Sequence, residues 1–195
     1  MIHAYPTARA EGRQPPRGGS AFALDDDKAY RLWRDAKFAG YPRSVDELWV
    51  EVSSLSAPTP AETDAILARC ARSNMCLYRI RQRLDGTHGA RTALGAFARH
   101  FGLHRFEAHR SAQVDGVVDI EVVEEGRRLG YIPYTNRPVG WHTDGYYNCE
   151  SPARMIRGVV LHCVRGASRG GANGLLDHEI AYIRLRDENP DFITA

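Results

Sequence analysis

Residues 139–148 read VGWHTDGYYN, and the prediction of fold and chemistry rests on this stretch. If residues 139–144 are extended, His142 and Asp144 point to the same face, because side chains along a strand alternate with a period of two. An imidazole and a carboxylate on one face form a donor pair suited to Fe(II), Mn(II) or Zn(II). Gly145 follows directly, so the chain can turn away and leave the pair accessible.

The same pair has a second interpretation that involves no metal. The chain contains eight histidines, so a His-x-Asp tripeptide arises readily by chance. His142 and Asp144 could simply hydrogen-bond to each other at the edge of a sheet. Spacing alone favours this second interpretation, and the surrounding sequence has to decide between the two.

The composition argues against several classes of protein. The chain has 195 residues, with 26 Lys and Arg against 24 Asp and Glu, and a formal net charge of +2. Basic and acidic residues are nearly equal in number, which argues against the clustered basic face that binds nucleic acid or a membrane surface. No stretch approaches the roughly 20 apolar residues of a spanning helix, and the N-terminus lacks the apolar run of a secretory signal. We therefore expect a soluble, cytoplasmic protein with neither nucleic acid nor membrane as a partner.

The first half of the chain is predicted to begin with an arm and to continue with helices and short strands. Residues 1–22 combine proline, glycine and scattered arginine without periodicity, which predicts a flexible N-terminal arm. Capping residues and apolar spacing then predict regular elements. These are helices over about 28–39, from Pro60 onward and over about 90–101, and strands at 50–52 and 75–80.

The second half has a pattern typical of strands and turns. Val117–Val123 alternates apolar with acidic residues, as a half-buried strand does, and Met155–Val164 is an apolar strand. A turn at Gly170–Gly171 follows, and Asp177 caps a helix that Pro190 ends. Short strands joined by Gly and Pro turns and packed by helices predict a mixed α/β fold with a sandwich or barrel.

Together with the sequence that follows it, the opening stretch resembles a known family. WHTDGYYN (141–148) and GVVLHCVRGASRGGANGLLDHEIAYIRL (158–185) are similar to the TauD/TfdA superfamily of Fe(II)- and 2-oxoglutarate-dependent dioxygenases. The shared order is Trp-His-x-Asp, an apolar strand, a Gly-Gly turn and an acidic helix start. Residues 161–163 (LHC) and 189–192 (NPDF) resemble the gamma-butyrobetaine hydroxylase branch. The fold implied is mixed α/β, a partial double-stranded β-helix (jelly roll) with flanking helices.

The resemblance implies roles for five residues. His142 would be one iron ligand and Asp144 the carboxylate ligand. Asn173 stands where many relatives have a Thr or Ser that contacts 2-oxoglutarate, and its amide can still donate a hydrogen bond. Tyr146 and Tyr147 are candidate substrate residues, since aromatic faces can hold a quaternary ammonium, although packing in the core or at the rim is the alternative. The implied reaction uses Fe(II), with 2-oxoglutarate as co-substrate, to hydroxylate a small organic molecule.

The sequence departs from the family pattern in one respect. In the family, the second histidine ligand and the arginine that pairs with 2-oxoglutarate lie well beyond the His-x-Asp segment, and this chain ends at Ala195. We therefore expect residues 23–195 to be a dioxygenase domain that is incomplete at its C-terminus.

Three hypotheses follow from this departure. The first is an oxidoreductase whose missing ligand comes from a second copy of the chain or from a complementing polypeptide. The second is a catalytically inactive dioxygenase fragment that acts as a binding or structural remnant. The third is a hydrolytic zinc site that uses His142, Asp144 and His162.

Overall fold

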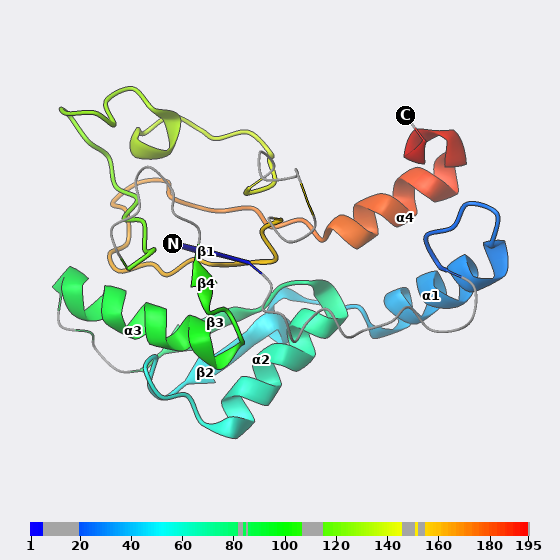
Figure 1. Cartoon of the computed structure of the whole chain (residues 1–195), viewed down its shortest axis with the longest axis horizontal. Helices are drawn as coiled ribbons and strands as arrows, with labels where there is room; N and C mark the ends of the chain where they lie inside the picture. Colours follow the sequence, from blue (N-terminus) through cyan, green and yellow to red (C-terminus); the bar gives the residue numbers. More distant parts are fainter. Residues whose placement is uncertain are drawn as a thin grey trace. The chain divides into compact units, whose positions relative to one another are not determined.

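The computed structural model describes residues 1–5, 20–81, 84, 86–106, 115–145, 151 and 155–194. The chain divides into two compact units, whose elements can be followed in Figure 1. The first unit comprises residues 1–12, 55–57 and 84–165, and the second comprises residues 13–54, 58–83 and 166–195. Because each unit combines segments that are distant in sequence, each is described by itself.

The second unit combines α-helices with a short parallel sheet. Its elements are α1 (Asp27–Gly40), η2 (Val45–Leu48), β2 (Trp49–Val52), α2 (Pro60–Ser73), β3 (Leu77–Ile80), α4 (His178–Glu188) and η5 (Pro190–Ile193). β2 and β3 pair in parallel, with Trp49 opposite Leu77 and Val52 opposite Ile80. Along β2, Val50 and Val52 are buried while their neighbours are exposed, so one face of this strand packs into the core.

Local hydrogen bonds begin and end the helices of this unit. Asp26 Oδ1 accepts a hydrogen bond from Ala29 N at 2.9 Å and caps α1. Thr59 and Glu62 cap α2 reciprocally, because each side chain accepts a hydrogen bond from the backbone of the other. Asn74 ends α2 in the left-handed conformation, with φ of 55°. The predicted helices after Asp25–Asp27 and from Pro60 are thus confirmed.

A buried carboxylate joins α4 to two other helices of the second unit. Asp177 Oδ1 accepts a hydrogen bond from Glu179 N, which caps α4, and another from Asn74 Nδ2, both at 2.9 Å. Its Oδ2 forms an ion pair with Lys37 Nζ of α1 at 2.8 Å. Burial on its own would lower the pKa of Lys37, but the carboxylates of Asp177 and Glu179 outweigh that effect and raise it. The charges of Asp177 and Lys37 therefore stabilise each other inside the unit.

The first unit consists of one long helix and a small antiparallel sheet. Its elements are β1 (Ile2–Tyr5), α3 (Gly86–His100), β4 (Arg105–Phe106), η3 (Ile132–Tyr134) and β5 (Gly158–Val160). The strand order is β4-β1-β5, and both pairings are antiparallel. Apolar side chains of α3 make much of the core, together with residues from the segment after it: Ala90, Leu94, Phe97, Ala98, Val117, Val118 and Tyr134.

A buried arginine ties α3 to the segment at residues 115–119. Arg91 Nη2 donates to Asp115 Oδ1 at 2.6 Å and to the carbonyl oxygen of Val117 at 2.8 Å. Its Nη1 pairs with the carboxylate of Asp119. A guanidinium can satisfy several acceptors in one plane, so its charge is compensated within the fold.

The predicted strand at Val117–Val123 is wrong. Val117 and Val118 are buried, and Val118 N donates to the carbonyl oxygen of Met1 at 2.9 Å. Ile120 and Val122, however, are 44% and 61% exposed, and residues 118–123 are irregular. Alternating residues form a strand only where a neighbouring strand pairs with them. Met155–Val164 likewise contributes only the short strand β5.

The fold class is confirmed as mixed α/β, but the described strands do not form the two packed sheets of a jelly roll. The helix predicted over 90–101 is present as α3, and Asp177 caps α4 as expected. β1 falls within residues 1–22, while residues 6–19 lie outside the described part, so the arm and the domain at 23–195 stay predictions. None of the described helices is long and apolar enough to cross a membrane.

Replacing Asp177 by Ala should destabilise the second unit strongly. The change leaves Lys37 buried beside Glu179 alone and removes the cap of α4, so we expect a loss of about 3 kcal/mol in the free energy of unfolding. Urea unfolding followed by tryptophan fluorescence measures this loss, since Trp33 and Trp49 both lie in this unit. Arg31→Ala is the control, because its partner Asp27 is 70% exposed, and its urea midpoint should stay near that of the wild type. Equal midpoints for the two variants would contradict the assignment.

Candidate functional site

His142 and Asp144 lie side by side in the first unit. His142 Nε2 is 3.3 Å from Asp144 Oδ1. Trp141 lies in a bend, His142 and Thr143 have no regular secondary structure, and a turn begins at Asp144, so the pair belongs to no strand. The predicted juxtaposition of the two side chains is therefore present although no strand forms here.

A backbone carbonyl orients the imidazole of this pair. His142 Nδ1 lies 2.8 Å from the carbonyl oxygen of Gly140. Because a carbonyl oxygen only accepts hydrogen bonds, we assign the ring proton to Nδ1. In the neutral ring with this tautomer, Nε2 carries the lone pair and lies 3.3 Å from Asp144 Oδ1. Two electron-pair donors at this distance can share a proton or a metal ion.

Solvent reaches both members of the pair. The side chain of His142 is 51% exposed and that of Asp144 is 33% exposed. Trp141 and Val139, which precede them, are also largely exposed. An ion or a small molecule can therefore approach the two donor atoms without any rearrangement of the segment at 139–144.

The other predicted site residues lie elsewhere or outside the described part. Asn173 belongs to the second unit, where its exposed Nδ2 donates to the carbonyl oxygen of Gly171 at 3.3 Å. Gly170 and Gly171, which precede it, have φ values of 71° and 76°, in the left-handed region that favours glycine. The predicted turn at these two glycines is not formed, and a bend lies just before them at Ser168 and Arg169. Tyr146 and Tyr147 lie outside the described residues.

A zinc site of His142, Asp144 and His162 is not formed. All three residues are described, and among the described residues no three His, Cys, Asp or Glu side chains are grouped so that they could hold a metal ion. His162 follows β5 and is half-buried, and this burial, together with the N-terminal ammonium group, lowers its pKa. The hydrolytic zinc hypothesis is therefore wrong.

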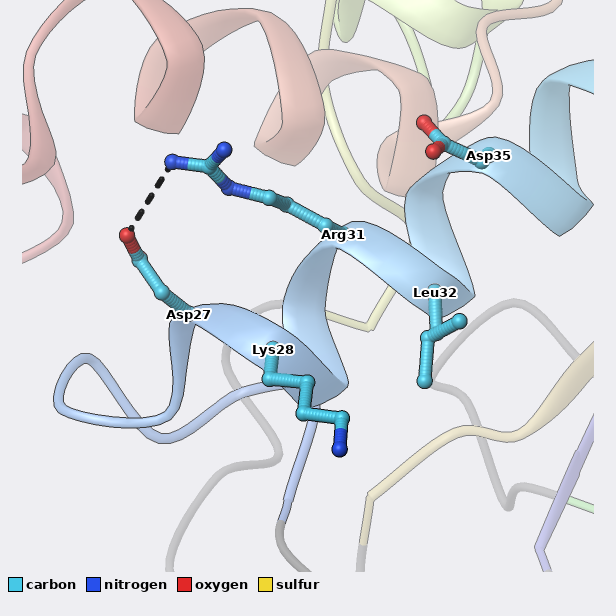
Figure 2. Close-up of a pocket in the computed structure, with 5 residues that line it drawn as sticks. All are labelled: Asp27, Lys28, Arg31, Leu32 and Asp35. Atoms are coloured by element: carbon cyan, nitrogen blue, oxygen red, sulfur yellow. Dashed lines mark hydrogen bonds and ion pairs between the residues drawn. The ribbon is translucent and has the colours of Figure 1, made fainter.

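A shallow hollow on α1 offers no alternative site. Figure 2 shows its lining, which comes from Asp27, Lys28, Arg31, Leu32 and Asp35. Asp27 and Arg31 form an ion pair at 3.5 Å, and both side chains are about two-thirds or more exposed. Charges spaced four residues apart on an exposed helix are typical of a solvated face.

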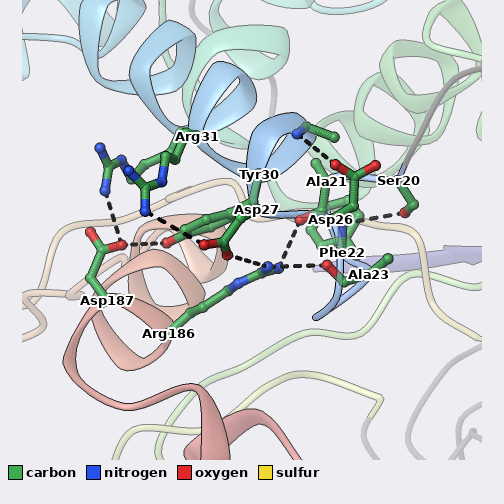
Figure 3. Close-up of polar contacts among 12 residues, drawn as sticks. Ser20, Ala21, Phe22, Ala23, Asp26, Asp27, Tyr30, Arg31, Arg186 and Asp187 are labelled. Carbon is green, nitrogen blue, oxygen red and sulfur yellow. Dashed lines mark hydrogen bonds and ion pairs between the residues drawn. The ribbon is translucent and has the colours of Figure 1, made fainter.

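A buried arginine network in the second unit has a structural role that the sequence did not indicate. Arg186 donates to the carbonyl oxygens of Ala21 and Ala23, both at 3.0 Å, and its guanidinium stacks 3.9 Å from the centroid of the Tyr30 ring (Figure 3). It thereby fastens the segment before α1 to α4. Only helical periodicity in α4 could have suggested that Arg186 faces inward, and that signal is weak because the helix is polar on most sides.

The same network perturbs Tyr30. Its hydroxyl donates to Asp187 Oδ1 at 2.7 Å. Burial, reinforced by the carboxylate of Asp187, raises the pKa of Tyr30 to about 12. A neutral phenol in this place is a stable hydrogen-bond donor between α1 and α4.

Comparison with known proteins gives a family for the chain. The family described as "Taurine catabolism dioxygenase TauD, TfdA family" matches residues 82–195, which is more than half of the chain. No curated protein and no solved structure matches it. The matched range contains α3, the His142–Asp144 pair, β5, the two glycines at 170 and 171, and α4. The order of motifs in the sequence and this match agree, and the chain belongs to the TauD/TfdA family.

Proposed function

We propose that the chain is an Fe(II)- and 2-oxoglutarate-dependent dioxygenase, in which His142 and Asp144 are two ligands of the metal. Membership of the TauD/TfdA family implies this class of activity and a small organic substrate. The observation that carries the assignment of ligands is the distance of 3.3 Å between His142 Nε2 and Asp144 Oδ1, within the residues that match the family.

The chemistry and spacing of the pair fit a divalent metal ion. Nitrogen and oxygen donors bound to one ion at roughly 2.0–2.2 Å lie about 3 Å from each other when they occupy neighbouring positions. The two atoms of this pair have nearly that separation. A histidine that ligates a metal usually donates its other ring N–H to a carbonyl or a carboxylate, and His142 Nδ1 has such a partner in Gly140. A carboxylate beside an imidazole also suits Fe(II).

Each proposed residue then has a defined task. The bound iron, with 2-oxoglutarate and dioxygen, supplies the oxidising chemistry that hydroxylates a C–H bond of the substrate while 2-oxoglutarate becomes succinate and carbon dioxide. His142 provides a neutral nitrogen donor whose orientation is held by Gly140. Asp144 supplies negative charge that partly neutralises the metal. We propose that the amide of Asn173 donates a hydrogen bond to 2-oxoglutarate.

The substrate side of the proposal rests on the resemblance to the gamma-butyrobetaine hydroxylase branch. Tyr146 and Tyr147 follow the ligand pair directly in sequence. We propose that their rings contact the substrate, and that they would favour a quaternary ammonium group through cation–π attraction worth about 0.5–2 kcal/mol for each ring.

The remaining ligands need a source. Among the described residues there is no group of three donors for a metal. We propose that a second histidine, and the arginine that pairs with 2-oxoglutarate, complete the site from outside the described part of the chain, from a second copy of the chain or from a complementing polypeptide.

Replacing His142 by Ala should abolish binding of a divalent metal. Mn(II) is a convenient probe, and its binding is followed by electron paramagnetic resonance of the free ion. Asp144→Asn should weaken binding as well, because it keeps the shape of the side chain and removes its charge. His178→Ala is the matched control, since His178 is exposed at the start of α4, and its Mn(II) affinity should equal that of the wild type. Unchanged affinity in His142→Ala would refute the assignment of the ligand.

The reaction itself is tested with the wild-type chain. Under anaerobic conditions, Fe(II) and 2-oxoglutarate together should produce a charge-transfer band in the visible range, and admission of air should yield succinate. Zn(II) should bind and yield no succinate, because the chemistry requires a redox-active metal. Asn173→Ala should raise the concentration of 2-oxoglutarate needed for half of the band while leaving Fe(II) affinity unchanged. A chain that binds Fe(II) but shows neither band nor succinate would instead be an inactive dioxygenase fragment with a binding or structural role.

A further inference from the structure

We infer that Gly145 and Ile156 are positioning residues, whose contact holds the carboxylate of Asp144 beside His142 Nε2. The inference rests on the proposed role of this pair as metal ligands. It concerns what keeps the two donors together, which neither the family match nor the spacing of the motif addresses. Gly145 and Ile156 both lie in the first unit, as do His142 and Asp144.

Burial shows which part of the turn is held by the protein. The side chains of His142 and Asp144 are 51% and 33% exposed, so packing around these side chains does little to restrain them. Residues 140–145 are all described, and among them Gly145 alone is buried. The point at which the turn is anchored is therefore the backbone of Gly145, directly after the carboxylate ligand.

Two independent constraints exclude a side chain at position 145. Its φ is 74°, in the left-handed region that L-residues rarely adopt. In addition, a Cβ atom at this position would lie 2.2 Å from Ile156 Cγ1 and 2.8 Å from Ile156 Cβ. Gly130 in the same unit shares only the first constraint, because its φ is 76° and no atom lies within 4 Å of an added Cβ. Position 145 thus requires glycine for two reasons, the positive φ and the lack of room for a Cβ atom beside Ile156.

Ile156 lies close to the sheet in sequence, and the atoms that an added Cβ would strike are its Cγ1 and Cβ, near its backbone. It precedes β5 by two residues, and β5 pairs with β1 through Gly158 opposite Ala4. At Gly158 the chain also approaches Leu103 closely, since an added Cβ would lie 3.3 Å from Leu103 Cδ2. A side chain at position 145 would therefore displace the turn rather than the sheet, and the carboxylate of Asp144 would move with the turn.

Four variants separate the contact from general strain. Gly145→Ala introduces both the clash and the unfavourable φ, whereas Gly130→Ala introduces the unfavourable φ alone. Ile156→Gly removes the atoms that a methyl group at position 145 would strike. The double variant Gly145→Ala/Ile156→Gly therefore retains the unfavourable φ at position 145 without the clash. Mn(II) is titrated into each, and its paramagnetic broadening of the His142 imidazole resonances is recorded, with assignment by their loss in His142→Ala. This readout detects weak binding and requires no turnover. Thermal unfolding is measured in parallel.

The expected result is a large loss of metal affinity in Gly145→Ala and a smaller loss in Ile156→Gly, because Ile156→Gly removes the contact without displacing the turn. The Mn(II) affinity of Gly145→Ala should fall by about tenfold or more, the size of effect seen when outer partners of metal ligands are lost. Gly130→Ala should keep the wild-type affinity although its Tm falls, and the double variant should bind Mn(II) as Ile156→Gly does. If Gly145→Ala does not fold, the double variant is compared with Ile156→Gly, and equal affinities support the contact.

Several outcomes would overturn the inference. A folded Gly145→Ala with wild-type affinity would do so, as would an equal loss in Gly130→Ala, or a double variant that binds about tenfold more weakly than Ile156→Gly. These results leave the proposed function intact if His142→Ala abolishes Mn(II) binding when the free ion is followed by electron paramagnetic resonance. If instead the wild type and His142→Ala bind Mn(II) equally in that measurement, the ligand pair itself is refuted, and the positioning role falls with it.

Discussion

The carboxylate of Asp177 is the contact on which the second unit depends. It caps α4, accepts a hydrogen bond from the residue that ends α2, and pairs with Lys37 of α1. A buried charge is costly unless its partners compensate it, so these helices are stable only in the arrangement that brings all three partners together. Arg91 has the corresponding role in the first unit, where it joins α3 to residues 115–119. Buried ionic groups thus join segments that are distant in sequence within each unit.

The candidate metal site is built differently, because its donors are exposed and their positions depend on the backbone. The carbonyl of Gly140 holds the imidazole of His142, and the turn at Gly145 presents Asp144. Exposed donors remain accessible to an ion and to co-substrates, while backbone contacts supply the order that side-chain packing does not. Metal binding in such a site is therefore sensitive to substitutions at positions whose side chains do not bind the metal. Gly145 has no side chain, yet it is where we expect a single methyl group to displace a ligand.

Predictions from the sequence succeeded where the signal is local. The helix starts at Asp26 and Thr59 depend on hydrogen bonds that span three residues, so the pattern of capping residues is sufficient to find them. The strand at 117–123 was wrong because strand formation depends on a partner that is distant in sequence. Alternation predicted burial of Ile120 and Val122, and both are exposed. The juxtaposition of His142 and Asp144 was predicted from their spacing of two residues, and it is present although the two residues lie outside any strand.

By itself, the sequence determined where the helices lie, the mixed α/β class, the family and the identity of the proposed donors, because each of these is encoded in residue types at short spacing. Only the tertiary structure decided which nitrogen of His142 faces Asp144, which strands pair in β4-β1-β5, and that Asp177 and Arg186 are buried. It also excluded His162 from a shared metal cluster with His142 and Asp144. The reason is the same in each case: these features depend on contacts between residues far apart in the chain, and a local pattern does not record which distant partner will compensate a charge or complete a hydrogen bond.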